Sequence, residues 1–180
     1  MGVPTWPSTP GLRTSRLDLE PLRVEHADEA ATALADPVLH RHTRGHPAGP
    51  DELRDRYARQ VGGHSPDGRH GWLNWVLRER SSGRLVGTVQ ATTSQAADGT
   101  RCAELAWVVA TGHQGQRLAV EAASVVAAWL IDRGTTDLVA HVHPDNLASA
   151  VTAHRLGMNP TPAVVDGEVE WRGRPGRPIR

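Results

Sequence analysis

Residues 103–142 constrain the fold more than any other part of this chain. Apolar residues recur there at helical spacing, and Gly134 follows the last of them, as glycine does after many helices; they stand at positions 118, 119, 122, 125, 126, 129 and 130. Strand-like runs, Ala103–Val109 and Thr136–Val142, flank this predicted helix of residues 116–132. A strand, a helix and a second strand in this order join parallel strands through a right-handed crossover. The segment therefore predicts one parallel strand pair.

The remaining elements are predicted from periodicity and from the residues that interrupt it. Apolar and polar residues alternate around Leu17 and Leu19, which indicates a half-buried strand. Further strands are expected at residues 72–79 and 85–93, with a final hairpin or edge strand within residues 163–171. Further helices are expected at residues 25–35, 51–61 and 146–157. These elements predict an α/β (α+β) fold with a mixed, mostly antiparallel sheet, one parallel β-α-β crossover and flanking helices.

Length and composition indicate a single domain. A chain of 180 residues is long enough to bury one core without disulfide bonds. Residues 1–11 carry three prolines and no apolar periodicity, so we expect a flexible N-terminal arm there. Residues 172–180 are rich in arginine, glycine and proline and predict a flexible basic tail. The expected domain is therefore residues 12–171.

The charge balance argues against several classes of partner. Twenty acidic residues balance twenty basic ones, so no global field attracts nucleic acid or an anionic membrane. The longest strongly apolar segment, Ala119–Ile131, falls well short of the roughly 20 residues that a membrane span needs. The single cysteine, Cys102, excludes an internal disulfide, and no signal-peptide pattern opens the chain. We therefore expect a cytoplasmic protein with no nucleic-acid or membrane partner.

The loop before the central helix has the features of an anion site. A helix N-terminus presents unpaired backbone N–H groups and a partial positive charge, which attract phosphate groups. Gly112 and Gly115 lie in this loop, and a residue without a side chain lets a phosphate approach the amides closely.

Three segments resemble, in order, the GNAT N-acetyltransferases. WVVATGHQGQRLAVEAA resembles the acetyl-CoA pyrophosphate loop of that family, with Gln114 at its first position and Ala119 at its last. AHVHPDNLASAVTAHRLGM resembles the next conserved block, particularly in the ribosomal-protein N-terminal acetyltransferase branch. LRTSRLDLEPLRVEHADEA is similar to the opening strand and helix of the same branch. The resemblance covers about residues 11–160.

The resemblance implies an acetyl-CoA-dependent N-acetyltransferase that uses no metal. It implies direct attack by a primary amine, either a protein α-amine or a small molecule, in a ternary complex. It assigns the pantetheine arm to backbone groups near Val108 and Val109. It assigns the diphosphate to the loop and helix start, which comprise Gln114, Gly115, Gln116, Arg117, Leu118 and Ala119. Asn146 and Ser149 either bind pantetheine or adenine-side groups, or Asn146 caps its helix.

Two positions depart from the family pattern. Arg117 stands where the pattern has glycine, so its guanidinium either contacts a CoA phosphate or its side chain spoils the loop. Ala153 stands where many members carry a tyrosine that protonates the departing thiolate. The alternative to an active enzyme is therefore a catalytically impaired acyl-CoA-binding or ligand-sensing module. The sequence also leaves open a longer acyl group, the identity of the amine and the oligomeric state, including a homodimer.

The candidate general base is Glu104, which lies on the strand that the resemblance assigns to the active site. The competing interpretation is an exposed strand carboxylate. An α-amino group titrates near pH 8, so a weak base suffices for it, whereas a lysine amine needs a stronger one. His141 and His143 share one strand face and serve as a proton relay, as a metal pair or as plain polar residues. The histidines of residues 40–46 suggest a metal site less well, because no carboxylate or cysteine partner stands at ligand spacing.

Overall fold

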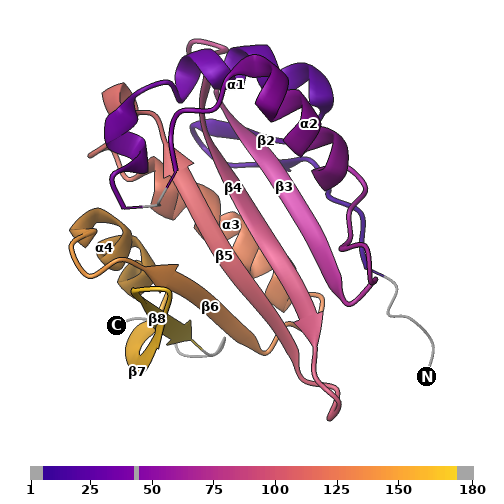
Figure 1. The fold of residues 1–180 in the computed structure, drawn as a ribbon. Coiled ribbons are helices and arrows are strands. Elements are labelled where there is room, and N and C mark those ends of the chain that lie inside the picture. Colours follow the sequence, from indigo (N-terminus) through magenta and orange to yellow (C-terminus); the bar gives the residue numbers. More distant parts are fainter. Residues whose placement is uncertain (1–5, 43–44, 174–180) are drawn as a thin grey trace.

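The computed structural model describes residues 6–42 and 45–173 and contains one mixed sheet (Figure 1). The strand order across this sheet is β1-β2-β3-β4-β5-β6-β8-β7. All neighbours in it are antiparallel except β5 and β6, which are parallel. The strands are β1 Leu12–Arg13, β2 Leu17–Pro21, β3 His70–Glu79, β4 Leu85–Gln95, β5 Arg101–Val109, β6 Asp137–Val142, β7 Asn159–Val165 and β8 Glu168–Gly173. The predicted mixed fold is confirmed.

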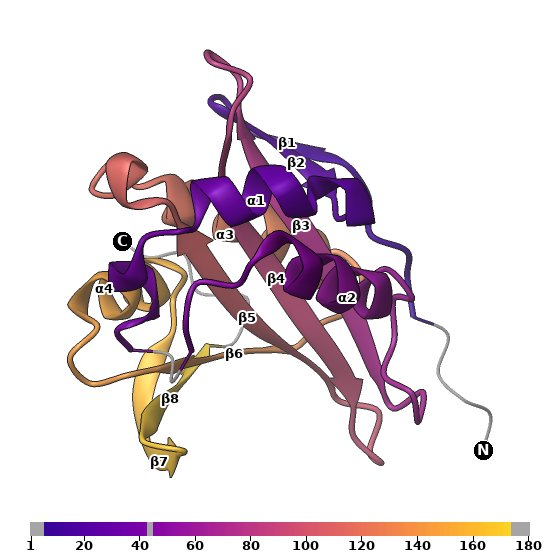
Figure 2. The same cartoon turned by 45° about the horizontal axis from the view of Figure 1, so that its top comes forward.

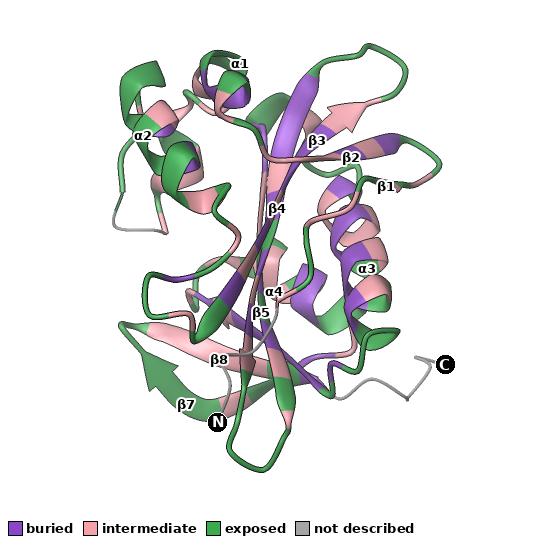
Figure 3. Cartoon of the chain, turned by 90° about the vertical axis from the view of Figure 1, so that its right-hand side faces the viewer, coloured by how far each residue is buried: buried purple, intermediate pink, exposed green. Residues whose placement is uncertain are grey.

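Helices cover both faces of the sheet (Figure 3). They are α1 Ala27–Ala33, α2 Pro50–Gln60, α3 Leu118–Ile131 and α4 Leu147–Arg155, with short 3-10 turns η1 Val24–His26, η2 Pro37–His40 and η3 Thr111–His113. The helices α1 and α2 lie on one face, and α3 and α4 pack on the other. No helix among the described residues is both long enough and apolar enough to cross a membrane.

The larger core lies between the sheet and α3. Leu105 of β5 and Val126 and Leu130 of α3 are almost completely buried in it. Ala140 of β6 and Ala153 of α4 extend the same core toward the end of the sheet. Burial of large aliphatic side chains contributes about 1.5–3 kcal/mol for each residue, so this layer holds the crossover helix against the parallel strands.

The smaller core lies under α1 and α2. Leu53 and Tyr57 of α2 pack there with Val76 of β3 and Leu85 of β4. Because Trp72 and Asn74 have the same parity as Val76 along β3, they face the same side of the sheet. This side is the α2 face, and part of it lies outside the helical cover (Figure 2).

The final hairpin begins earlier than residue 163, where the sequence placed it. Strand β7 starts at Asn159, and Asp166-Gly167 forms the turn into β8 with positive φ at both residues, 51° and 87°. An Asp-Gly pair is a preferred two-residue hairpin turn, since both positions need positive φ. Pro160 and Pro162 are tolerated because β7 is the last strand of the sheet.

The two expected terminal segments make contacts where the structure describes them. The Trp6 indole N–H donates to the carbonyl of Gly68 at 3.0 Å, and the Trp75 indole donates to the carbonyl of Pro10 at 2.7 Å. Arg172 is part of β8 and pairs with Glu170. The other residues of the expected arm and tail, 1–5 and 174–180, lie outside the described residues. The domain boundaries themselves stay a prediction.

A network of charged groups ties η1 and α1 to the sheet. Arg78 on β3 donates to the carboxylates of Glu20 and Glu29 at 2.9 and 3.0 Å. His26 is 4% exposed beside this network, and its Nε2 lies 3.3 Å from Glu20. Burial, followed by the charge of Arg23, lowers the pKa of His26 below its ordinary value. The folded chain therefore resists protonation at this histidine.

This histidine predicts a loss of stability in acid. The unfolded chain takes up a proton at His26 near its ordinary pKa of about 6.5, whereas the folded chain does not, so stability is present above that pH and lost below it. When the pH is lowered below about 6.5, the unfolding free energy of His26→Gln, measured by urea titration, falls less steeply with pH than that of the parent protein. The difference in slope reaches at most about 1.4 kcal/mol per pH unit, the value for one proton. Equal slopes would contradict the account.

Candidate active site

The parallel strands β5 and β6 separate after a short paired segment (Figure 1). Their partners are Cys102 with Asp137, Ala103 with Leu138, and Glu104 with Val139, and no pair follows. Strand β5 keeps its pairing with β4 up to Val109. Beyond Glu104, the β6 side of β5 therefore presents backbone N–H and C=O groups that pair with no strand.

The chain leaves β5 through η3 and enters α3 with a row of free amides. Six consecutive backbone N–H groups, Gly115 to Val120, donate to no group within the described residues. The first amide that does so is that of Glu121, which bonds to the carbonyl of Arg117 at 3.1 Å. Unpaired amides in a loop with left-handed residues form a concave anion site at a helix N-terminus. Gly115 supplies the first left-handed residue, with a φ of 75°.

Arg117 adopts the backbone conformation that glycine would take. Its φ and ψ are 63° and 19°, and it is the residue that precedes α3. A residue with a Cβ atom in this conformation costs about 1–2 kcal/mol, so the surrounding structure must hold it there. The side chain is exposed and forms no ion pair with the described part of the chain. The left-handed turn also explains why α3 begins at Leu118 rather than at residue 116, where the periodicity placed it.

Gln114 tethers this loop to the end of β5. Its side-chain Nε2 donates to the carbonyl of Val109 at 3.0 Å, and its backbone amide bonds to the carbonyl of Thr111. The side chain therefore faces the strand end, while the amides that follow remain available. Gly115 and Gln116 are exposed, Ala119 is half-buried, and Leu118 is buried in the core.

A second anchor, which sequence reasoning missed, holds the opposite side of the loop. Glu121, in the first turn of α3, accepts hydrogen bonds from the hydroxyls of Thr14 and Ser15 and from the backbone and side chain of Arg16. Partial burial pushes the pKa of Glu121 upward, but these bonds outweigh it and lower the pKa. Arg16 also donates to the carbonyl of Gln116 at 3.0 Å. The turn between β1 and β2 thus fixes the loop and neutralises an acid near the free amides.

Glu104 and His141 lie side by side where the two strands separate. His141 Nδ1 is 3.1 Å from Glu104 Oε1, and the two side chains are 20% and 51% exposed. Both point away from the core of α3, to the α2 face. The structure therefore places the candidate base at the apex of the split, with a histidine as its partner. His143 contacts His42 instead, with ring centroids 5.1 Å apart.

The three candidate residues at α4 have different roles in the structure. Asn146 caps α4, because its side chain accepts a hydrogen bond from the amide of Ser149 at 3.1 Å. The Ser149 hydroxyl has no partner within the described residues. Ala153 is fully buried in the core and offers no polar group.

Other candidates lie apart from a metal or nucleophile site. Burial raises the pKa of the Cys102 thiol, which keeps it protonated and unreactive. No group of three histidine, cysteine, aspartate or glutamate side chains in residues 6–42 and 45–173 lies close enough to hold a metal ion. His46 pairs with Glu52 rather than with the other histidines.

A family model described as the GNAT acetyltransferase domain matches residues 16–159. The match covers more than half of the chain, so the chain belongs to the GNAT acetyltransferase family, whose members are acetyl-CoA-dependent N-acetyltransferases. No curated protein matches the sequence significantly.

Several solved acetyltransferase structures share the fold. An Agrobacterium tumefaciens acetyltransferase is 24% identical with a TM-score of 0.69, and the alignment covers 94% of this chain and 96% of that one. A Bacillus anthracis GNAT acetyltransferase is 14% identical with a TM-score of 0.72, covering 90% and 95%. RimL, a ribosomal α-N-protein acetyltransferase in complex with coenzyme A, is 14% identical with a TM-score of 0.71, covering 89% and 95%.

The left-handed backbone at Arg117 predicts a stabilising substitution. Arg117→Gly removes the steric cost of positive φ, and part of that gain is offset by the greater freedom of glycine in the unfolded chain. We expect the unfolding free energy to rise by about 0.5–1 kcal/mol. Arg117→Ala is the matched control, since it removes the charge but keeps the Cβ atom, and it brings no gain. A lower unfolding free energy in Arg117→Gly, measured by urea titration, would show that the left-handed backbone at Arg117 carries no steric strain.

Proposed function

We propose that this enzyme binds acetyl-CoA with its diphosphate on the free amides at the start of α3. The observation that carries this proposal is the row of six unpaired amides, Gly115 to Val120, next to the separated strands. Their concave arrangement fits a diphosphate, and the unpaired edge of β5 near Val108 and Val109 fits the amide-bearing pantetheine arm. Ser149 has a free hydroxyl for the same ligand. Asn146 caps the N-terminus of α4 and thereby positions Ser149.

We also propose that Arg117 contributes a charged contact to a CoA phosphate. Its guanidinium is exposed at the mouth of the anion site and has no partner in the residues that the structure describes. Arginine suits this role because its planar donors match phosphate oxygens. The loop keeps a glycine-like backbone, so the side chain does not spoil it.

The chemistry follows from where the protein's own groups lie. Acetyl-CoA, when bound, supplies an acetyl thioester. Backbone donors on the open edge of β5 orient and polarise the acetyl carbonyl, because they are fixed by the pairing of β5 with β4. The amine approaches from the α2 face, where Glu104 accepts its proton, and His141 orients that carboxylate. Direct attack in a ternary complex needs no covalent enzyme intermediate.

The proton for the departing thiolate comes from water or from a residue outside α4. Ala153 has no acidic group, and its side chain is buried. A thiolate is a good leaving group, so the reaction tolerates the loss of a dedicated acid. An active enzyme is therefore favoured over an impaired CoA-binding or ligand-sensing module.

The acceptor is a primary amine, and we favour a protein α-amine. The resemblance of three segments to the ribosomal-protein branch supports it, as does the absence of a strong buried base beside Glu104 in the described residues. An α-amine near pKa 8 is partly neutral at pH 7, so a carboxylate suffices to deprotonate it.

Titration calorimetry tests the assigned contact at Arg117. Arg117→Gly and Arg117→Ala both lose the guanidinium, so we expect each to bind acetyl-CoA about tenfold more weakly and with less dependence on salt. A glycine variant that binds acetyl-CoA more tightly than the parent would show that the side chain obstructs the site, whereas a parent and variants that all fail to bind would remove the proposed function.

A thiol-release assay tests the assigned base. We expect Glu104→Gln to lower kcat/KM for a primary amine by about 100-fold at neutral pH while acetyl-CoA affinity stays within twofold. The loss shrinks at higher pH, where the amine deprotonates without help. Glu25→Gln, an exposed carboxylate on η1, is the matched control. Unchanged activity in Glu104→Gln would remove Glu104 from the mechanism, and acetyl-CoA binding without turnover of any amine would support the sensing module.

A further inference from the structure

A cavity of about 260 Å³ opens on the α2 face, beside the site where the amine is deprotonated. Side chains of α2, β3 and β4 line it, among them Arg56, Arg59, Gln60, Trp72, Asn74 and Gln90. The resemblance did not assign any of these residues a role. They come from segments far apart in the sequence, which the sheet brings together.

The strand register connects this cavity with Glu104. Trp72 on β3 pairs with Thr92 on β4, and Thr92 pairs with Glu104 on β5. In the same way, Asn74 pairs with Gln90. Paired residues lie on one face of a sheet, and neighbouring strands are about 4.8 Å apart. The cavity lining therefore begins at Thr92, about 5 Å from Glu104, and reaches Trp72 at about 10 Å, on the face from which the amine approaches.

Three amide side chains that line the cavity make no hydrogen bond within the described part of the fold. Gln60, Asn74 and Gln90, which we call the amide strip, form no side-chain hydrogen bond with any residue in the described part of the chain. Gln60 and Asn74 are half-buried and Gln90 is exposed, so their amide groups can reach a molecule in the cavity. Each primary amide offers both donors and an acceptor, which complement the N–H and C=O groups of a peptide backbone.

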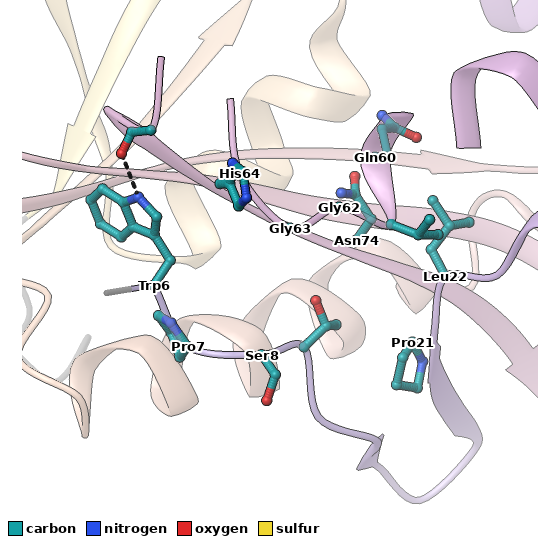
Figure 4. Close-up of a pocket in the computed structure, with 13 residues that line it drawn as sticks. Trp6, Pro7, Ser8, Pro21, Leu22, Gln60, Gly62, Gly63, His64 and Asn74 are labelled. Atoms are coloured by element: carbon teal, nitrogen blue, oxygen red, sulfur yellow. Dashed lines mark hydrogen bonds between the residues drawn. The ribbon is translucent and has the colours of Figure 1, made fainter. Parts of the chain in front are cut away.

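The amide strip also leads into a second cavity, of about 710 Å³ (Figure 4). Gln60 and Asn74 line both cavities. Figure 4 shows these two residues at one end of the second cavity and Trp6 at the other. The N-terminal segment Trp6–Thr9 forms its wall, fixed by the bond from Trp6 to Gly68. The surface that begins at Glu104 and crosses the amide strip, which we call the path, therefore continues into this second cavity.

The two ends of this path differ in charge. Glu104 stands at the first end. Arg56 and Arg59 line the same cavity as the amide strip. Arg56 pairs with Glu52 at 2.7 Å, while Arg59 has no ion pair within residues 6–42 and 45–173. An acceptor with an amine at one end and an anionic group about 10 Å away fits this polarity.

We propose that the acceptor is an extended peptide, whose N-terminal amine lies at Glu104 and whose backbone crosses the amide strip. This inference rests on the proposed function and adds the substrate class. An extended peptide advances about 3.3 Å per residue, so its third or fourth residue reaches the amide strip. Arg59 then selects an acidic side chain at that position. Later residues enter the cavity walled by Trp6–Thr9.

Peptides of increasing length test the proposal. With acetyl-CoA and thiol-release detection, kcat/KM rises at least tenfold between an amino-acid amide and a tetrapeptide. An acidic third or fourth residue is preferred over lysine by about tenfold, and Arg59→Glu reverses that preference. Arg84→Glu, an exposed arginine at the turn between β3 and β4, is the matched control and leaves the preference in place.

Variants of the amide strip give a second, independent measurement. The double variant Asn74→Leu/Gln90→Leu is expected to have a higher KM for the tetrapeptide. The ratio of kcat/KM for the tetrapeptide to kcat/KM for a dipeptide falls about tenfold. Gln95→Leu, at the far end of β4, is the matched control. Acetyl-CoA affinity, measured by calorimetry, verifies that each variant is folded.

The outcomes separate this inference from the proposed function. Turnover of a single-residue amine or of a non-peptide amine as fast as the tetrapeptide would overturn the peptide groove but leave the transferase intact. Equal effects of the amide-strip variants on short and long peptides would also overturn it. Failure to bind acetyl-CoA or to acetylate any amine would remove the proposed function itself.

Discussion

The left-handed turn at Arg117 is the constraint on which the site depends. A helix that began two residues earlier would use the amides of Ala119 and Val120 in its own hydrogen bonds and shorten the row of free amides. The positive φ at Arg117 delays the helix and leaves a row of amides exposed. Its steric cost is offset by contacts on both sides: Gln114 bonds to the end of β5, and Arg16 bonds to the loop and to Glu121. Position 117 is therefore arginine rather than glycine, but its backbone adopts the left-handed conformation typical of glycine.

The separation of β5 and β6 has a different physical origin. Strand β5 is paired with β4 along its whole length, whereas β6 is paired with β8 from Leu138 to Val142. The strands β6 and β8 and the helix α4 therefore form one unit, and β5 belongs to the other. Ala140 and Ala153 pack together in the core under β6 and hold α4 against that unit. The open edge of β5 and the free amides of α3 consequently lie at the same end of the sheet, which is where one long ligand can use both.

Periodicity predicted the central crossover well because it is a local signal. Helix α3 and its flanking strands were located within two residues at every end. The Asp166-Gly167 pair is also a hairpin signal in the sequence, although it was not used to predict the turn. The start of β7 was missed because Pro160 and Pro162 argue against a strand, and only the position of β7 at the sheet edge permits them.

Other features depend on contacts that no local pattern encodes. The bond between Arg16 and Glu121 spans 105 residues of sequence, and the alignment of Asn74 with Gln90 depends on strand register. The pairing of Glu104 with His141 depends on the register between β5 and β6, which the predicted parallel strand pair did not specify. The conformation of Arg117 runs against the preference of its residue type, so sequence could pose the question but not answer it.

Amide hydrogen exchange tests the central claim most directly. The account predicts that coenzyme A slows exchange at Gly115 to Val120, because its diphosphate accepts hydrogen bonds from these amides. Pantetheine, which lacks the diphosphate, should leave exchange there unchanged while it protects the edge of β5. Binding of coenzyme A without protection at the start of α3 would contradict the account.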